Sequence, residues 1–405
     1  MTTDGAKFPK VKGAHRRDET TLRLGGIGDN WHMSWAADDS QVVALCDGYG
    51  WPGTRRRSYN SRLYRITGSP PQVGFEDVPG YPELTSERGT PGGFSRYYGF
   101  GTLAHDGRIY QFLSTPNVPF DQPDPRFIGA KLIYSADDGA TWRNQDGSSP
   151  VVWEPWESRS KQNMAFFDES QEAFGLLTIL QMGRNYEHNT DGFVYVYATN
   201  GNTDGTMNEL VMFRARKDRV LDRGGYEYFA GTRDGGARWT PDIDARGVVC
   251  SFPRGWVNTT THPYAWHPSV VYNQPLGVYL MANWGMGCAA DGRWFGKPSY
   301  LGFWVSRNPW GPWEQIHEET AWTPCDDPGA RAYQPQIAPK WIAPDGKSFW
   351  LVWTDFQEGT DVTGTRQAAA GSTGEDASDE EIRHRLPAPR PYYAFNMQRV
   401  DVAVG

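Results

Sequence analysis

The sequence contains no apolar run of about 18 residues, the length that a membrane-spanning helix requires. Aliphatic residues are scarce, because all hydrophobic residues together make up only 38% of the 405 positions. Helical periodicity is nearly absent as well. Aromatic residues reach 14%, and there are 46 Gly and 29 Pro. Many turn formers combined with many aromatics favour short β-strands over helices, and the aromatic content excludes bulk disorder.

The chain also lacks an excess of basic residues, since 40 Lys and Arg are outnumbered by 48 Asp and Glu. Phosphate contacts need clustered positive charge, so nucleic acid is not an expected partner. A phosphate-binding loop, a dinucleotide fingerprint and a G-x-S-x-G nucleophile elbow are absent too. The composition fits a protein that acts on a neutral or weakly charged substrate without a membrane partner, and we expect a monomer.

Only four cysteines are present, without C-x-x-C spacing, which is too few for a disulfide scaffold and does not predict a zinc site. Histidines and carboxylates show no H-E-x-x-H or comparable ligand spacing. We therefore expect no cofactor, although structural calcium on scattered carbonyl oxygens stays open.

The first 21 residues lack the apolar core of a secretory signal. A trimmed chain, a cytosolic protein and a phage product would all begin in this way, and we expect action outside the cell or in its envelope.

A loose internal repeat is the clearest signal of organisation. Residues 131–142 read KLIYSADDGATW, residues 228–239 read YFAGTRDGGARW, and residues 302–313 read GFWVSRNPWGPW. The shared pattern resembles the Asp-box, a hairpin turn in which an Asp caps backbone N–H groups above a Trp. Asp and Gly suit such a turn. The Asp-box is a structural element of many propellers, so it bears on the fold rather than on the activity.

Five strand-rich segments of about 60–90 residues follow one another along the chain, each with a Gly or Asp turn typical of antiparallel meanders. They cover approximately residues 22–80, 95–150, 160–241, 246–318 and 330–404. Five meanders predict an all-β chain folded as a five-bladed β-propeller, with a six-bladed sialidase-type propeller as the alternative. We expect residues 1–21 to form an N-terminal arm, residues 22–405 a single catalytic propeller domain, and residues 357–390 a flexible loop inserted into the last blade.

Asp29 and Asp47 are the candidate catalytic residues because they belong to two strands joined by a tight turn at Asp38-Asp39. A two-residue turn would place Asn30 opposite Asp47 and Asp29 opposite Gly48. Opposed or diagonal side chains in such a hairpin lie about 4.5–8 Å apart. Two carboxyl groups at that separation can flank a glycosidic bond, one protonating the leaving oxygen and the other activating water or attacking the sugar. Asp and Gly before aromatic residues also simply make turns, so the spacing alone leaves both readings open.

Further candidates lie at strand ends that would converge on one face of a propeller. Trp31 and Trp51 could stack on a sugar, and His267 could contact substrate or equally well bond only to backbone. Arg184 and Asp191 could orient hydroxyl groups or belong to a salt-bridged loop. The complete set of candidate substrate-binding residues is Trp31, Trp51, Asn60, Tyr98, Gln181, Arg184, Asp191, His267, Trp284 and Gln334.

Several short motifs resemble those of glycoside hydrolase family 183, the five-bladed endo-D-arabinanases, and their uncharacterised relatives. They are GDNW at 28–31, CDGYGW at 46–51 followed by Asn60-Ser61, QMGRNY at 181–186, DGFVYVY at 191–197, WHPSVVYN at 266–273 and SRNPWGPW at 306–313. The resemblance covers most of residues 22–356 and 391–403.

The resemblance implies endo-acting hydrolysis of D-arabinan, as in arabinogalactan and lipoarabinomannan. It also implies an early Asp pair as catalytic acid and base, which in this sequence matches Asp29 and Asp47. Asn30 and Trp31 depart from the commoner versions of the first motif, which weakens the prediction of the sugar. We expect an inverting reaction. A carbohydrate-binding propeller without catalysis and a sialidase-like exo-glycosidase remain as alternatives.

Overall fold

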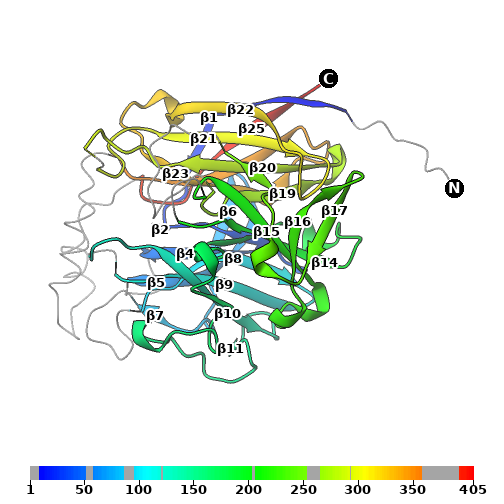
Figure 1. The fold of residues 1–405 in the computed structure, drawn as a ribbon. Helices are drawn as coiled ribbons and strands as arrows, with labels where there is room; N and C mark the ends of the chain where they lie inside the picture. Colours follow the sequence, from blue (N-terminus) through cyan, green and yellow to red (C-terminus); the bar gives the residue numbers. More distant parts are fainter. Residues whose placement is uncertain are drawn as a thin grey trace, which may run out of the picture.

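The computed structural model describes residues 9–51, 58–85, 95–119, 122–202, 206–252, 265–291, 293–357 and 392–405. Within these ranges the strands form five antiparallel sheets arranged around a common axis (Figure 1). The protein is therefore a five-bladed β-propeller, as the sequence predicts, and the six-bladed alternative is wrong.

Each blade is a meander that runs outward from the axis, and the sheets follow one another in chain order. The first blade contains β2 (Ile27–Asp29), β3 (Met33–Trp35), β4 (Gln41–Gly50), β5 (Tyr59–Ser69), β6 (Gln72–Asp77) and β7 (Leu84–Thr85). The second contains β8 (Tyr98–His105), β9 (Arg108–Pro116), β10 (Phe127–Ser135), β11 (Arg143–Asn144) and β12 (Phe166–Phe167). The third contains β13 (Leu177–Ile179), β14 (Phe193–Thr199), β15 (Glu209–Arg216), β16 (Glu227–Arg233), β17 (Gly236–Thr240) and β18 (Cys250–Ser251).

The last two blades have four strands each. The fourth contains β19 (Ser269–Asn273), β20 (Val278–Gly285), β21 (Ser299–Ser306) and β22 (Glu314–Trp322). The fifth contains β23 (Ala332–Ile342), β24 (Ser348–Asp355), β25 (Asn396–Val404) and β1 (Val11–Arg23). The described helices are single 3-10 turns: η1 (Trp156–Ser158), η2 (Ser170–Glu172), η3 (Arg184–Tyr186), η4 (Lys217–Arg219), η5 (Arg223–Gly225), η6 (Ile243–Ala245), η7 (Gln274–Leu276) and η8 (Pro324–Asp326). None of the described helices has the length and apolar content needed to cross a bilayer.

The innermost strands close a ring, since β3 contacts β8, β8 contacts β13, β13 contacts β19, β19 contacts β23, and β23 returns to β3. Burial follows this arrangement. Every residue of β8 is buried, whereas exposed and half-buried residues alternate along β6 at the rim of the first blade. A strand covered on both faces needs apolar residues at successive positions, and a strand with one wet face needs alternation.

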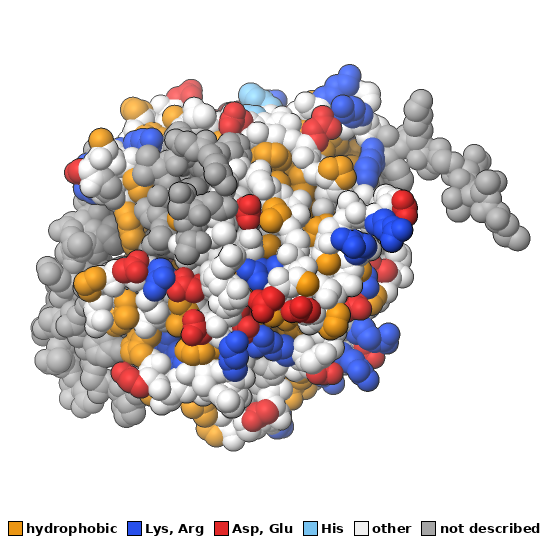
Figure 2. Space-filling view, in the orientation of Figure 1, with side chains coloured by type: hydrophobic (Ala, Val, Ile, Leu, Met, Phe, Trp, Pro, Cys, Tyr) orange, Lys and Arg blue, Asp and Glu red, His pale blue; other side chains and the backbone are white. Residues whose placement is uncertain are grey.

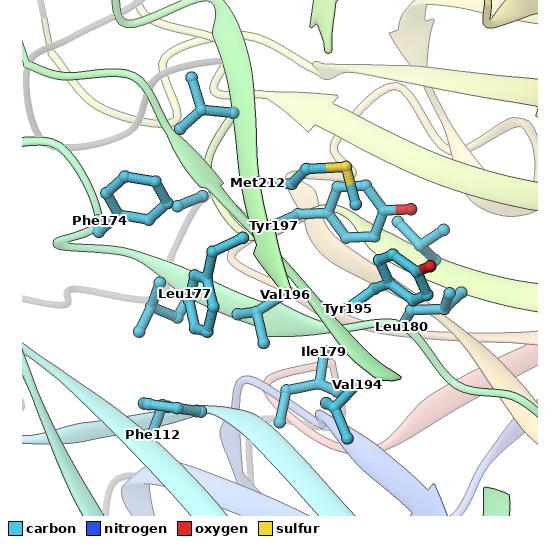
Figure 3. Packing of buried hydrophobic residues seen from close by; sticks show 14 of the residues in the cluster. Phe112, Phe174, Leu177, Ile179, Leu180, Val194, Tyr195, Val196, Tyr197 and Met212 are labelled. Carbon is cyan, nitrogen blue, oxygen red and sulfur yellow. The ribbon is translucent and has the colours of Figure 1, made fainter. Parts of the chain in front are cut away.

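Between the blades the core is aromatic. Figure 3 shows Phe112 of β9 lying across from Leu177 and Ile179 of β13, with Val194 and Val196 of β14 beside them. Large rings fill the wedge between two twisted sheets with few side chains. This packing explains why a chain poor in aliphatic residues still builds a continuous core.

Side-chain hydrogen bonds close the turn at 135–142, and its identification as an Asp-box stays a prediction. Asp137 accepts hydrogen bonds from the backbone N–H of Thr141 at 2.8 Å and from its hydroxyl at 2.7 Å. The Trp142 ring is buried, and its indole N–H donates to the Gly139 carbonyl at 3.2 Å. The likeness of the other two segments to this turn stays a prediction.

The N-terminal segment closes the fifth blade. We expected residues 1–21 to form a separate arm, but β1 pairs with β25 along most of its length, so this prediction is wrong for residues 11–21. A ring made of consecutive meanders leaves an unpaired edge in its last blade, and the N-terminal strand covers that edge. The predicted loop at 357–390 lies, apart from Gln357, outside the described residues.

One face of the molecule appears in Figure 2, with Lys and Arg interspersed among Asp and Glu. A charge-assisted contact joins the closing strand to the neighbouring blade. Arg16 of β1 donates from Nε and from Nη2 to the two carboxylate oxygens of Glu319 in β22, at 2.6 and 2.8 Å. Burial alone would raise the pKa of Glu319, but hydrogen bonds from His317 and Arg16 outweigh it and hold the pKa below its ordinary value.

Glu319→Gln is expected to lower the free energy of unfolding at pH 7 by about 1–2 kcal/mol, because hydrogen bonds to a charged partner exceed neutral ones. A depressed folded-state pKa stabilises the protein above the pKa of the unfolded chain and loses that effect as the pH falls through the folded value. The difference between the two proteins should therefore shrink below about pH 4 in denaturant titrations. Glu314→Gln is the control, since Glu314 is exposed on the same strand. An equal effect of both substitutions would contradict the assignment.

Candidate active site

The first strands of the blades begin at one end of the ring, and a cluster of buried side chains from all five blades fills that end. We call it the aromatic floor. It consists of Cys46, Tyr98, Phe100, Phe127, Leu176, Trp266, Trp284, Met286, Cys288 and Tyr333, with Phe295, Phe356 and Tyr393 packed against it. Asp29 and Asp47 lie at the same end, on β2 and β4.

The register of the β2–β4 pair differs from the one that we predicted. Asp29 faces Cys46 rather than Gly48, and Ile27 faces Gly50. The turn between β3 and β4 is one residue longer than expected, because the Ala36 N–H donates to the Ser40 carbonyl. Three residues of β4 then oppose a single residue of β2, and Asp47 lies in this bulge. Bulges redirect side chains and are frequent beside active sites.

Gly48 permits the close approach of the two strands at the bulge. A Cβ added there would lie 1.9 Å from the Ile27 carbonyl oxygen, which no side chain can tolerate. The bulge that aims Asp47 therefore depends on glycine at this position.

Four non-glycine residues near the aromatic floor have left-handed backbone conformations: Asn30 (φ 60°), Asp47 (φ 44°), His267 (φ 27°) and Gln334 (φ 56°). They come from three blades. Such conformations cost of order 1–3 kcal/mol each and persist where surrounding contacts enforce them, most often at functional sites. All four lie beside the aromatic floor and the Asp29–Asp47 pair, so left-handed backbone and a buried carboxyl occur together at this end.

The Asp29 carboxyl group is buried and fully bonded. Tyr333 donates from its hydroxyl to Oδ2 at 2.7 Å, and the Asn30 side-chain amide donates to Oδ1 at 2.6 Å. Gln334 fixes Asn30 by accepting its backbone N–H at 2.9 Å. Burial raises the pKa of Asp29 to about 7, the nearby charge of Asp47 adds to the rise, and hydrogen bonds from Tyr333, Asn30 and Tyr393 oppose it. Asp29 therefore exchanges its proton near neutral pH.

Asp47 is half-buried and so is the more accessible of the two carboxylates. The Asn60 side-chain Nδ2 donates to the Asp47 Oδ1 at 3.2 Å, and the Asn60 side-chain Oδ1 accepts the Tyr97 backbone N–H at 2.7 Å. The Tyr393 hydroxyl donates to the Asp47 backbone carbonyl at 3.1 Å. No described Lys or Arg forms an ion pair with Asp29 or Asp47. The two carboxyl groups thus lie beside aromatic rings without a described cationic partner.

The structure brings several other predicted residues to this end. Tyr98 and Trp284 belong to the aromatic floor, and Asn60 and Gln334 bond to the carboxylate pair or its neighbours. His267 is buried, stacks on Phe100 with ring centroids 4.3 Å apart, and lies 3.1 Å from His32 between ring nitrogens. His267 therefore packs beneath the aromatic floor, against Phe100.

Five predicted residues lie elsewhere. Trp31 is wholly buried and donates to the Thr354 hydroxyl, while Trp51 stacks on Phe75 at 3.8 Å between centroids, so both fill the core between the first and fifth blades. Gln181 lies midway along the axis and donates to the Thr102 carbonyl.

Arg184 and Asp191 lie at the opposite end of the ring. Arg184 donates to the Ala37 carbonyl in the β3–β4 turn, and Asp191 precedes β14, where it accepts the Tyr195 hydroxyl at 2.5 Å. The structure therefore does not bring these two residues to the Asp29–Asp47 end, and sequence motifs do not reveal which end of a strand carries a residue.

Sequence reasoning missed Tyr333, Tyr393 and His32. Tyr333 directly precedes a predicted site residue, and Tyr393 begins the last strand-rich stretch, but tyrosine is so frequent in this chain that neither stood out. Asp355 is another buried carboxyl at the end of β24, where it accepts the Arg331 backbone N–H at 2.7 Å, and burial raises its pKa to about 6.

The ring axis is nearly filled. A small cavity lined by residues from all five blades, including His32, Gln181, Ser269 and Gln336, leaves about 10 Å³ for the centre of a water molecule, room for about one. Burial lowers the pKa of His32 to about 3, so this histidine is neutral.

Among the described residues, no group of three or more His, Cys, Asp or Glu side chains is arranged to hold a metal ion.

No family model matches the chain, and no curated protein does. Solved structures similar to it include a putative hydrolase from Bacteroides ovatus (14% identity, 93% of this chain and 87% of that chain, TM-score 0.49). An α-L-arabinofuranosidase from Podospora anserina (10%, 94% and 92%, TM-score 0.42) and an endo-arabinase from Bacteroides thetaiotaomicron (13%, 82% and 89%, TM-score 0.37) are also similar. At these scores the likeness carries no inference about activity, and the resemblance to family 183 stays a prediction.

The raised pKa of Asp29 predicts a pH-dependent stability cost. A carboxyl whose folded pKa lies above its unfolded value destabilises the protein once the unfolded chain has ionised, so stability falls as the pH rises from about 4 to about 7. Asp29→Asn should therefore increase the free energy of unfolding at pH 7 by more than at pH 4. Denaturant titrations at both pH values measure this, and a gain that is equal at the two would contradict the raised pKa.

Proposed function

We propose that this protein is a glycoside hydrolase in which Asp29 and Asp47 are the catalytic pair. The observation that carries the proposal is a buried, protonatable carboxyl beside a more accessible carboxylate, enclosed by aromatic rings at one end of the propeller axis. Acetal cleavage needs one group that gives a proton and another that takes one, with pKa values set apart by their surroundings.

Asp29 is the proposed acid, because burial lets it keep its proton near neutral pH. It would give that proton to the glycosidic oxygen as the bond to the anomeric carbon breaks. Asp47 is the proposed base. It would take a proton from the water whose oxygen forms the new bond to the anomeric carbon, which inverts the configuration. Phe295, Phe356 and Tyr393, which are only partly buried against the aromatic floor, would supply flat apolar surfaces of the kind on which sugar rings stack.

The proposed substrate is a D-arabinan, cleaved within the chain. This part of the proposal rests on the resemblance of the GDNW and CDGYGW motifs to family 183. A neutral polysaccharide suits two acidic groups that have no described cationic partner, since an anionic sugar would be repelled by them. The same consideration disfavours a sialoside.

Asp29→Asn and Asp47→Asn are each expected to reduce kcat/KM on D-arabinan by at least about a thousandfold, because each removes a proton-transfer group. Product sizing of digested arabinogalactan measures this. Asp191→Asn is the matched control, since Asp191 is an exposed aspartate at the other end of the ring. It should stay within about twofold of the unsubstituted protein.

If both Asp variants keep full turnover, the pair is not catalytic. If the unsubstituted protein binds polysaccharides but cleaves none in a panel of mycobacterial and plant glycans, it is a carbohydrate-binding propeller. Release of sialic acid from a fluorogenic sialoside would favour the exo-glycosidase instead.

The anomeric configuration of the first product tests the single-water mechanism. We expect inversion, observed by proton NMR within the first minutes of digestion. A retained product would require a covalent intermediate on one carboxylate and would remove the role proposed for Asp47 as base.

A further inference from the structure

Two tyrosines of the fifth blade reach across the ring closure to the carboxylate pair of the first blade. Tyr333 begins the inner strand β23 and is buried, and Tyr393 lies just before β25 and is half-buried. Tyr333 donates to Asp29 Oδ2 at 2.7 Å, and Tyr393 donates to the Asp47 backbone carbonyl at 3.1 Å. The Tyr393 hydroxyl also lies close enough to the Asp29 carboxyl to oppose the rise of its pKa.

We propose that Tyr333 and Tyr393 are positioning residues, which hold Asp29 and Asp47 next to each other through their hydroxyl groups: Tyr333 bonds to the Asp29 carboxyl, and Tyr393 bonds to the Asp47 backbone carbonyl. This inference rests on the proposed function only in naming the reaction that Asp29 and Asp47 would carry out. The hydrogen bonds from the two tyrosines are present without substrate.

The geometry supports a polar role beyond packing. A phenol has one proton to donate, so Tyr393 cannot donate to the Asp47 backbone and to Asp29 at the same time. When Asp29 loses its proton, a charged acceptor attracts the Tyr393 hydroxyl more strongly than a neutral carbonyl does. The tyrosine pair can thus follow the protonation state of Asp29 by a change of one hydrogen bond.

The pKa of Asp29 also supports a polar role for the two tyrosines. Burial and the Asp47 charge raise the pKa of Asp29, and the bonds from Tyr333 and Tyr393 are among those that oppose the rise. Removing them should leave the ionised carboxyl less stabilised in an apolar site. A pure packing role predicts otherwise, since Phe fills the same volume as Tyr and would leave Asp29 unchanged.

Tyr333→Phe and Tyr393→Phe test the inference, with Tyr226→Phe as the matched control. Tyr226 is also buried, and its hydroxyl donates to the Val220 carbonyl at 2.5 Å, within the core cluster shown in part in Figure 3. The carboxyl ¹³C resonance of Asp29, assigned by its disappearance in Asp29→Asn, is titrated in each variant. Thermal unfolding reports whether each variant is folded. Tyr393 is half-buried, so Tyr393→Phe should fold even if the substitution of the buried Tyr333 prevents folding.

We expect an upward shift of the Asp29 titration in both tyrosine variants and none in Tyr226→Phe. On a substrate that the protein cleaves, kcat/KM should fall roughly tenfold, and the alkaline limb of its pH profile should move to higher pH, since Asp29 acts in its protonated form. Unchanged Asp29 titration in both folded variants would overturn the inference.

The outcome for the proposed function is separate. If the titration shifts but no glycan is cleaved, the tyrosines position a carboxyl that is not catalytic, and the hydrolase proposal fails alone. If Asp29→Asn abolishes cleavage while both tyrosine variants titrate and react as the unsubstituted protein does, the hydrolase proposal stands and the tyrosine inference fails.

Discussion

A buried carboxyl group held next to a second carboxylate is the constraint on which the rest of this site depends. Asp29 is removed from water and faces the charge of Asp47, so its ionised form is costly. Hydrogen bonds from Tyr333, Asn30 and Tyr393 offset part of this cost by stabilising the ionised carboxylate. A protein selected for stability alone would place an apolar residue there. The proposed proton transfer rests on this arrangement.

The propeller supplies what this arrangement needs, namely rigid elements from several blades that meet at one end of an axis. The first blade provides both carboxylates, and the fifth provides their hydroxyl partners. These two blades are neighbours only because the ring closes, which the pairing of β1 with β25 secures. Closure and site geometry are thus coupled, since a loosened fifth blade would also release Tyr333 from Asp29.

Residues with left-handed backbone conformations also lie next to the Asp29–Asp47 pair. The left-handed Asn30, Asp47, His267 and Gln334 are held by packing and by hydrogen bonds such as that from Asn30 to Gln334. The opposite end of the ring, where Arg184 bonds to the β3–β4 turn, is closed by exposed ion pairs and backbone contacts of an ordinary kind. Left-handed residues occur at that end as well, at Asp39, Asp106 and Asn185, so the buried Asp29 carboxyl, and not strain alone, distinguishes the two ends.

The sequence by itself determined the five meanders and the Asp29–Asp47 hairpin, because alternation, turn residues and short motifs are local and survive without a structure. Only the tertiary structure decided the register, since a one-residue change in the turn and a bulge at Asp47 cannot be counted from the chain. It also decided that Trp31 and Trp51 fill the core and that Arg184 lies at the far end. The sequence did not reveal Tyr333 and Tyr393, because residues more than 300 positions from Asp29 become its neighbours only when the ring closes.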